Sequence, residues 1–325
     1  MRLELPGLFD LQVNGFAGVD FNSPATTPDE VWQAIARVRA TGVTRLLPAL
    51  ITSSLELFTQ CARTLLATKH PAIAGLHLEG PYIAAEDGPR GAHPRSHVIP
   101  ASIEDFRRRQ EAAQGTIRLV TLAPEVPGVL PLMEYLAVQG IHIAIGHTAA
   151  APEQIQDAIK AGATLSTHLG NGCAQRLPRH PNFIWEQLAA DELSASLIVD
   201  GHHLPPATVK TMIRAKTPAR TILITDAMAA AGCSPGRYEL NGEMVELDDT
   251  GRVAPPGKPW LAGSSLTLDR AVANTVKFAG LSVDVAWAMA SIQPAAYLGL
   301  KPAGRVHVEW DAAGCRFTNL QVVEP

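Results

Sequence analysis

The feature that most constrains this chain is a regular alternation of short apolar, β-branched runs with helical patterns. The runs fall at residues 8–13, 44–50, 74–78, 117–122, 141–145, 163–167, 195–199 and 221–225. Nearly continuous apolar runs of this length are typical of parallel strands that are buried on both faces. Eight strand–helix units are also the number that closes a (β/α)8 barrel. The sequence therefore predicts an α/β fold of the TIM-barrel type.

Helical patterns separate these strands, and several begin at Ser, Thr or Pro and end at Gly. They cover residues 28–40, 55–68, 103–113, 152–161 and 206–216, with two more at 267–279 and 283–297. Residues 233–260 break the alternation with short strands and turns, and we expect them to lie over the barrel mouth. Residues 303–325 alternate like a small hairpin that would pack on the barrel. We expect one catalytic domain over 1–325, with the barrel at about 6–300.

Composition fits this fold and excludes several classes of function. The 325 residues leave room for a barrel of about 250. The net charge is −4 without blocks of like charge, which argues against a nucleic-acid-binding protein. The N-terminus lacks an apolar leader and no window is apolar enough to span a membrane, so neither export nor a membrane is expected. Four scattered cysteines favour free thiols in a reducing cytoplasm.

Reactive residues of such barrels sit at the carboxyl ends of the strands. The ends carry Gln12 and Asn14, Thr52, Glu79, Pro124, His147, His168, Asp200, His202 and His203, and Asp226. Within this set, Glu79, His147 and His168 give one carboxylate and two imidazoles, which leaves one position of a tetrahedral metal for water. That is the ligand count of a catalytic zinc site.

Strand periodicity supports this selection of histidines. His77 is two residues from Glu79, so it shares the inner face one layer deeper and is expected to support the site rather than bind metal. His142 is five residues from His147, so the two cannot share a face, and His142 should point outward. Each histidine taken alone could serve packing only, but three potential ligands at three rim positions favour a metal site.

Asp226 ends the apolar strand TILIT, and two roles fit it. It could cap the following segment as an N-cap residue. It could also act as a general base beside a metal, taking a proton from water and passing it to a leaving amine. Its place at the end of the eighth strand favours the second role.

These motifs resemble the N-acetylglucosamine-6-phosphate deacetylases of the amidohydrolase superfamily. The matching pieces are PGLFDLQVNG, GLHLEGPYI, RGAHP, IGHTAA, STHLGNG, VDGHH, LITDAMAAAG and LAGSSLTLDRAV. They run in family order from Pro6 to about Val272. The resemblance implies a homodimer that removes the N-acetyl group of an amino-sugar phosphate. It also implies one divalent metal per subunit, expected to be Zn²⁺, with Fe²⁺, Mn²⁺ or Co²⁺ as alternatives.

Residue by residue, the resemblance makes Glu79, His147 and His168 the metal ligands and Asp226 the acid/base. His93 would polarise the acetyl carbonyl. The substrate-binding residues that it implies are Ala92, Asn171, Gly172 (through its backbone N–H), His203 and Arg179. Arg179 would reach the phosphate of the partner subunit's substrate, and Arg176 competes for that role.

The chain departs from the family in three places, which indicates a divergent subgroup. Asn171-Gly172-Cys173 replaces the usual Asn-Ala-Met and follows Gly170, which is expected to open space near the substrate. The strand-rich segment that normally precedes Pro6 is missing, so an accessory β-sandwich should be reduced or absent. The stretch 170–188 also differs. Two rivals therefore stay open: an amidohydrolase acting on another N-acyl amine, and a non-catalytic sugar-phosphate binder.

Gln12 and Asn14 stand where some amidohydrolases carry a His-x-His pair that holds a second metal. Neutral amides are poor zinc ligands beside imidazole and carboxylate. The resemblance places the chain in the single-metal branch, where these two side chains would hydrogen-bond residues of the metal site.

Overall fold

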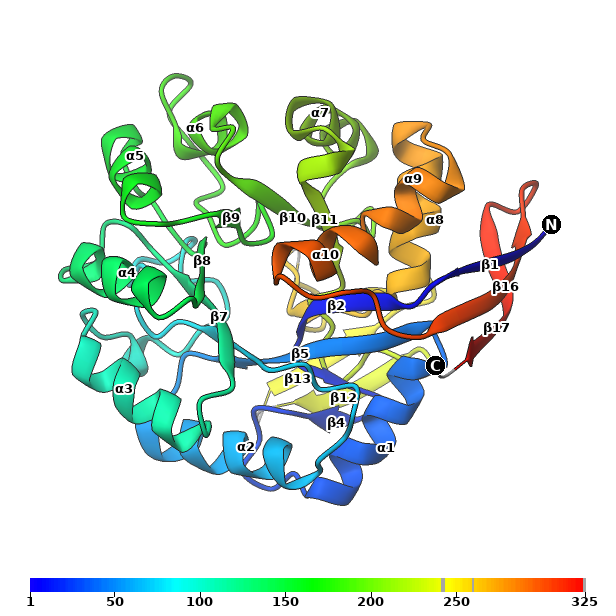
Figure 1. Cartoon of the computed structure of the whole chain (residues 1–325), viewed down its shortest axis with the longest axis horizontal. Helices are drawn as coiled ribbons and strands as arrows, with labels where there is room; N and C mark the ends of the chain where they lie inside the picture. The colour runs from blue at the N-terminus through cyan, green and yellow to red at the C-terminus, as the bar shows by residue number, and fades with distance from the viewer. Residues whose placement is uncertain (241–242, 259, 324–325) are drawn as a thin grey trace.

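The computed structural model describes residues 1–240, 243–258 and 260–323 and shows a nearly closed barrel (Figure 1). Its wall is one sheet of eight strands, all parallel to their neighbours. In order they are β2 (Leu8–Val13), β5 (Val43–Ile51), β6 (Leu76–Glu79), β7 (Ile117–Leu122), β8 (His142–Ile145), β9 (Leu165–Ser166), β10 (Ser194–Ile198) and β11 (Thr221–Ile224). The predicted α/β barrel and its eight strands are confirmed.

Helices follow the strands and cover the outside of the barrel (Figure 1). They are α1 (Pro28–Arg39), α2 (Leu55–Ala67), α3 (Ile103–Ala112), α4 (Val129–Val138), α5 (Pro152–Lys160), α6 (Phe183–Ala189), α7 (Pro206–Lys216) and α8 (Leu268–Ala279). Six of these match predicted helices to within a residue or two. The sequence did not predict α4 and α6. Helix α4 begins at Gly128 without a side-chain cap, so it lacks the usual start signal.

The helix expected over 283–297 is wrong as a single element. The structure has two short helices there, α9 (Val283–Ala288) and α10 (Ile292–Tyr297). Pro294 explains the break, because its ring would clash with the carbonyl of Ala290 in a continuous helix. The Ala290 carbonyl instead accepts a hydrogen bond from the Phe9 backbone N–H at 2.8 Å. The break thus fastens the last helices to the first barrel strand.

Two smaller sheets accompany the barrel. An antiparallel sheet contains β12 (Gly236–Leu240), β13 (Glu243–Leu247), β14 (Arg252–Ala254) and β15 (Gly263–Ser264). The Asn-Gly pair at 241–242, which predicts one of the expected turns, lies outside the described residues. A second sheet joins β1 (Arg2–Pro6) to the hairpin of β16 (Arg305–Asp311) and β17 (Arg316–Val323). Short elements complete the described chain: β3 (Gly15–Phe16), β4 (Val19–Asp20), η1 (Arg95–His97) and η2 (Pro218–Arg220).

The barrel closes where its first and last strands meet. The Asp226 backbone N–H donates to the Gln12 carbonyl at 3.0 Å, and Val13 forms a parallel bridge with Ala227. Below this point, buried Asp10 accepts from the backbone N–H groups of Gln12 and Thr225, both at 3.2 Å, and from the Thr225 hydroxyl at 2.5 Å. A carboxylate therefore joins the two strands that close the barrel.

Replacing Asp10 with asparagine should remove a pH dependence of stability. Burial, which outweighs the hydrogen bonds from Thr225, raises the pKa of Asp10 from 3.8 to about 7. The unfolded chain therefore binds fewer protons across this window, so the wild-type free energy of unfolding falls as pH rises through it. The wild-type free energy of unfolding, measured relative to that of the asparagine variant, should therefore fall by about 2 to 3 kcal/mol between pH 5 and pH 8. Urea unfolding at both pH values measures it, and an unchanged difference would contradict the prediction.

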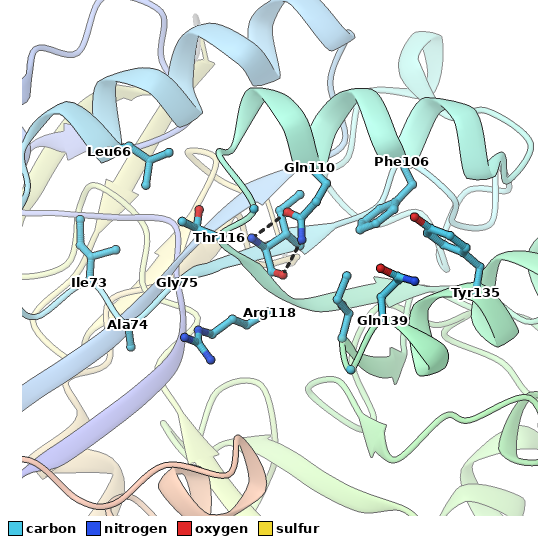
Figure 2. Close-up of a pocket in the computed structure, with 14 residues that line it drawn as sticks. Leu66, Ile73, Ala74, Gly75, Phe106, Gln110, Thr116, Arg118, Tyr135 and Gln139 are labelled. Carbon is cyan, nitrogen blue, oxygen red and sulfur yellow. Dashed lines mark hydrogen bonds between the residues drawn. The ribbon is translucent and has the colours of Figure 1, made fainter.

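A hollow of about 410 Å³ lies at the opposite end of the barrel from the predicted site, beside the amino-terminal ends of β6 and β7 (Figure 2). The Gln110 side chain crosses part of it and bonds both the N–H and the carbonyl of Ile117, at 3.0 and 3.2 Å. The lining residues include none of the predicted site residues. Side chains at this end of a barrel ordinarily serve stability.

Candidate active site

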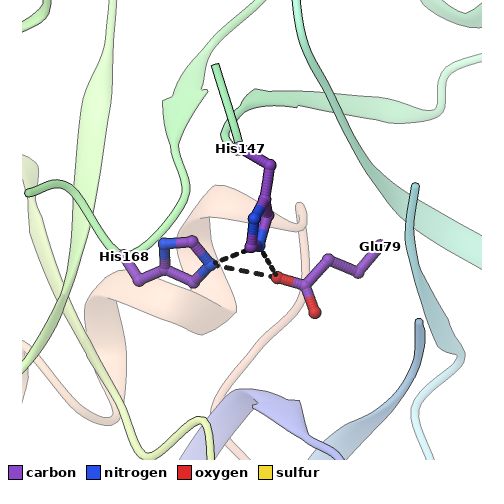
Figure 3. A group of neighbouring side chains, drawn as sticks. All are labelled: Glu79, His147 and His168. Atoms are coloured by element: carbon purple, nitrogen blue, oxygen red, sulfur yellow. Dashed lines mark hydrogen bonds and ion pairs between the residues drawn. The ribbon is translucent and has the colours of Figure 1, made fainter. Parts of the chain in front are cut away.

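Glu79, His147 and His168 converge at the carboxyl ends of β6, β8 and β9 (Figure 3). The Glu79 Oε1 atom lies 3.1 Å from His147 Nε2 and 3.0 Å from His168 Nε2, and the two Nε2 atoms are 3.1 Å apart. All three side chains are buried. The sequence prediction that these residues share one rim position is matched by this geometry.

The chemistry of this group fits a divalent cation. His147 Nδ1 lies 2.9 Å from the Pro89 carbonyl, which only accepts, so Nδ1 carries the proton of the neutral ring. His147 Nε2 therefore presents a lone pair to the Glu79 carboxylate and to His168 Nε2. His168 Nδ1 has no hydrogen-bond partner among the described residues. With the proton of the His168 ring on that nitrogen, three lone-pair-bearing atoms would face one another, and a cation between them would offset their repulsion. Two imidazoles and a carboxylate are also a common ligand set of catalytic zinc.

Backbone conformation distinguishes the residues at the strand ends. His147, His168 and Asp226 have φ values of 52°, 31° and 49°, in the left-handed region that non-glycine residues seldom adopt. Unusual backbone conformations of this kind cluster at functional sites. The three residues follow three separate strands, so no shared local sequence motif explains their positive φ values.

Gln12 and Asn14 hold Asp226 by one of its two oxygens. Gln12 Nε2 lies 2.9 Å from Asp226 Oδ1 and 2.9 Å from Glu79 Oε1, and Asn14 Nδ2 lies 2.7 Å from the same Oδ1. Two amide donors on Oδ1 leave Oδ2 as the more basic oxygen. Burial, followed by the nearby charge of Glu79, raises the pKa of Asp226 above its ordinary value. These contacts are the ones that the sequence led us to expect of Gln12 and Asn14.

His93 completes the inner part of the site. Its Nε2 lies 3.9 Å from Glu79 Oε2, and its ring centroid is 4.2 Å from that of His147. Burial, with the neighbouring His147, lowers the pKa of His93 to about 3, so the ring is neutral at pH 7. A neutral histidine here can donate one hydrogen bond from Nε2 toward the centre of the site.

The two histidines expected to lie away from the group do so. His77 sits one layer deeper, with Nδ1 at 3.1 Å from the Leu11 carbonyl and Nε2 at 2.8 Å from the Thr121 hydroxyl. His142 packs its ring on Tyr297, at 4.7 Å between centroids. The positions of His77 and His142 therefore agree with those expected from strand periodicity.

The loop 170–173 lies against the Glu79, His147 and His168 group. A Cβ atom on Gly172 would be 2.8 Å from His147 Nδ1, and Gly172 has a φ of +56°, so glycine suits this position on both counts. The space left by the missing side chain is therefore filled by the His147 ring, and the expected opening toward substrate does not arise on that side. Asn171 donates to the His168 carbonyl at 3.2 Å, which places it beside the same group.

The remaining predicted substrate contacts differ in how firmly the structure fixes them. His203 is held by Asp200, whose Oδ2 lies 2.6 Å from Nδ1. Asp200 also accepts from two backbone N–H groups of the same loop, and the sequence had named it without a role. Ala92, Arg176 and Arg179 are exposed, and among the described residues neither arginine forms an ion pair. His202 bonds the Thr250 carbonyl at 3.2 Å and so faces away from Asp200.

Comparison with known proteins gives a consistent result. The Amidohydrolase family matches residues 4–313. A human N-acetylglucosamine-6-phosphate deacetylase is 36% identical over 92% of this chain and 75% of its own. An N-acetylgalactosamine-6-phosphate deacetylase of Escherichia coli O157:H7 is 34% identical over 94% of this chain and 83% of its own. A solved variant of the N-acetyl-D-glucosamine-6-phosphate deacetylase of Mycobacterium smegmatis, in complex with N-acetyl-D-glucosamine-6-phosphate, superposes with a TM-score of 0.89 at 31% identity, over 98% of this chain and 85% of its own.

Proposed function

The chain belongs to the amidohydrolase family, and within it to the amino-sugar-phosphate deacetylases, and on that premise we propose that it hydrolyses N-acetylglucosamine 6-phosphate to glucosamine 6-phosphate and acetate. The observation that carries the proposal is the Glu79, His147 and His168 group with Asp226 beside it. Membership of the family implies a divalent metal, and this group is the place for it. We propose zinc, because the ligand set is the one that zinc prefers.

A bound ion would supply Lewis-acid chemistry, polarising the acetyl carbonyl and lowering the pKa of water. Asp226 takes a proton from the attacking water through Oδ2, because Oδ1 is occupied by Gln12 and Asn14. His93 donates from Nε2 to the acetyl oxygen as negative charge develops there. When the C–N bond breaks, Asp226 returns its proton to the amine, so the products are acetate and the free amino sugar.

The outer residues would position the sugar phosphate. His203, fixed by Asp200, and Asn171, fixed beside His168, would contact the sugar. The exposed guanidinium groups of Arg176 and Arg179 lack ion-pair partners among the described residues, so either is available for a phosphate. In line with the family resemblance, we propose that Arg179 reaches the substrate of a partner subunit in a homodimer.

One further proposal concerns the compartment of the protein. All four cysteines are free, which fits a reducing compartment, and we propose a cytoplasmic enzyme. No helix in the described part of the chain has the length and apolar character needed to cross a bilayer.

The function is tested by a screen of acetate release from four compounds: the 6-phosphates of N-acetylglucosamine and N-acetylgalactosamine, unphosphorylated N-acetylglucosamine, and an N-acetyl amino acid. We include the galactosamine compound because a relative of similar identity carries that activity in its name. We expect the highest kcat/KM with N-acetylglucosamine 6-phosphate. Preference for the amino acid or for the unphosphorylated sugar would contradict the proposal, and metal analysis of the same sample gives the ion.

In the same screen Arg179→Ala should raise KM for the phosphorylated sugar by about 10- to 100-fold, the value of a charge-assisted hydrogen bond. Activity on the unphosphorylated sugar should be unchanged, because only the phosphate contact is lost. Arg176→Ala tests the competing residue, and Arg63→Ala, an exposed arginine on α2, is the control. If neither Arg176→Ala nor Arg179→Ala changes KM, this loop does not bind the phosphate.

A further inference from the structure

Thr52 contacts His93 through two of its atoms. The Thr52 hydroxyl oxygen lies 2.8 Å from His93 Nδ1, and the Thr52 backbone N–H donates to the same nitrogen at 3.3 Å. Both residues are buried, with 1% of Thr52 and 4% of His93 exposed. Thr52 follows the last residue of β5, so it stands at the same rim as the metal group.

The backbone contact identifies which nitrogen of His93 carries the proton in this structure, and the shorter hydroxyl contact adds a second donor to the same nitrogen. A backbone N–H can only donate, so His93 Nδ1 must accept and must hold a lone pair. In a neutral imidazole the proton then resides on Nε2, which is the nitrogen that faces Glu79. The ring is therefore prepared to donate toward the centre of the site. The opposite tautomer would present a lone pair there and would repel a developing oxyanion.

Thr52 is itself held on several sides. The neighbouring Ile51 N–H donates to Asn22 Oδ1 at 2.8 Å, and buried Arg109 donates to the Ser53 carbonyl at 3.2 Å. The strand β6 approaches so closely that a Cβ on Gly80 would lie 2.2 Å from the Thr52 hydroxyl oxygen. The glycine of the HLEGP segment therefore makes room for the hydroxyl. A loosely held threonine would not fix a tautomer, whereas this one has little freedom to turn.

We propose that Thr52 is a positioning residue that holds His93 as the Nε2–H tautomer, with that N–H directed at the acetyl oxygen of the substrate. The inference rests on the proposed function for the role of His93, but not for the hydrogen bonds themselves. It also gives a reason for glycine at position 80, because any side chain there would displace the hydroxyl.

The test compares Thr52→Val, which removes the hydroxyl with little change of shape, with Thr52→Ser, which retains it. In Thr52→Val, kcat should fall by about 10-fold or more while KM changes less than about threefold, since a donor to the transition state is weakened but binding is not. Thr52→Ser should recover kcat to within about threefold of wild type. Thermal unfolding of both variants should stay close to that of the wild type.

The ¹⁵N resonances of the imidazole report the tautomer directly, in both the metal-free and the metal-loaded protein. His93 is assigned by the loss of its signals in His93→Gln. We expect a pyrrole-type Nε2 and a pyridine-type Nδ1 in the wild type and in Thr52→Ser. Thr52→Val keeps only the longer backbone contact of 3.3 Å, so we expect a mixture of tautomers there.

Three results would overturn the proposal: a wild-type His93 protonated on Nδ1, a Thr52→Val variant with wild-type kcat, or a loss of kcat in both variants that tracks a loss of thermal stability. Failure of the proposed function looks different. In that case the wild-type protein would release no acetate from any compound of the screen, while the resonances of His93 would still depend on the Thr52 hydroxyl.

Discussion

Asp226→Asn is expected to lower kcat by about 10³-fold while the fold and the metal content are kept. Asparagine matches the shape of aspartate, and its side-chain oxygen can still accept from Gln12 and Asn14, which donate to Oδ1 at 2.9 and 2.7 Å. What is lost is the second oxygen, which we propose accepts a proton from water. An amide nitrogen in its place has no basic lone pair, so neither the attack nor the departure of the amine is assisted.

The measurement is kcat at saturating metal, together with metal analysis and the thermal unfolding curve of the same preparation. Asp157→Asn, an exposed aspartate on α5 that pairs with Lys160, is the matched control and should leave all three quantities unchanged. A kcat of Asp226→Asn within tenfold of the wild type would exclude Asp226 as the acid/base.

His147→Gln is expected to abolish tight metal binding and to lower turnover by on the order of 10³-fold or more, since an ion that stabilises transition-state charge contributes several kcal/mol. His147 Nε2 lies 3.1 Å from both Glu79 Oε1 and His168 Nε2, so removing it leaves only two of the three proposed ligand atoms. The wild-type protein should unfold at a higher temperature when metal is added, because a ligand that binds only the native state stabilises it. The variant should lose that response.

His142→Gln is the matched control, because it makes the same substitution in a histidine that points away from the site and packs on Tyr297. It should keep one ion per chain and full turnover. A fully loaded His147→Gln protein would contradict the ligand assignment. Two fully occupied ions per wild-type chain would contradict the single-metal site expected from Gln12 and Asn14.

Much of the barrel was predictable because its signals are local. Buried parallel strands appear as apolar runs in the sequence. Capping residues mark where helices begin, as the capping box at Thr27 does for α1. The rim residues followed, since the carboxyl ends of such strands meet at one face. Helix α4 was missed because Gly128 gives no side-chain cap. The break before α10 has a local signal in Pro294, whereas the bond of Ala290 to Phe9, far away in the chain, has none.

Other features of the site could not be predicted because they depend on geometry between strands. The sequence shows that Gln12, Asn14 and Thr52 end strands, but not that the first two share one oxygen of Asp226 or that the third bonds His93. Gly172 was interpreted as open space because the approach of the His147 ring is invisible in sequence. The roles of Arg176 and Arg179 stay predictions, since phosphate contacts depend on a bound substrate.

The closure of the barrel between its first and last strands affects the order in which the residues of the site come together during synthesis. The three ligand candidates follow β6, β8 and β9, which lie close together in the chain. Gln12 and Asp226, in contrast, are separated by 214 residues. During synthesis the first strand leaves the ribosome long before the last. The hydrogen bond from Gln12 to Asp226 therefore cannot form until the last strand has been made. We therefore expect Glu79, His147 and His168 to be synthesised before Asp226, the proposed general base. Hydrolytic competence therefore requires ring closure, because Gln12 and Asn14 hold Asp226 only where the first and last strands meet.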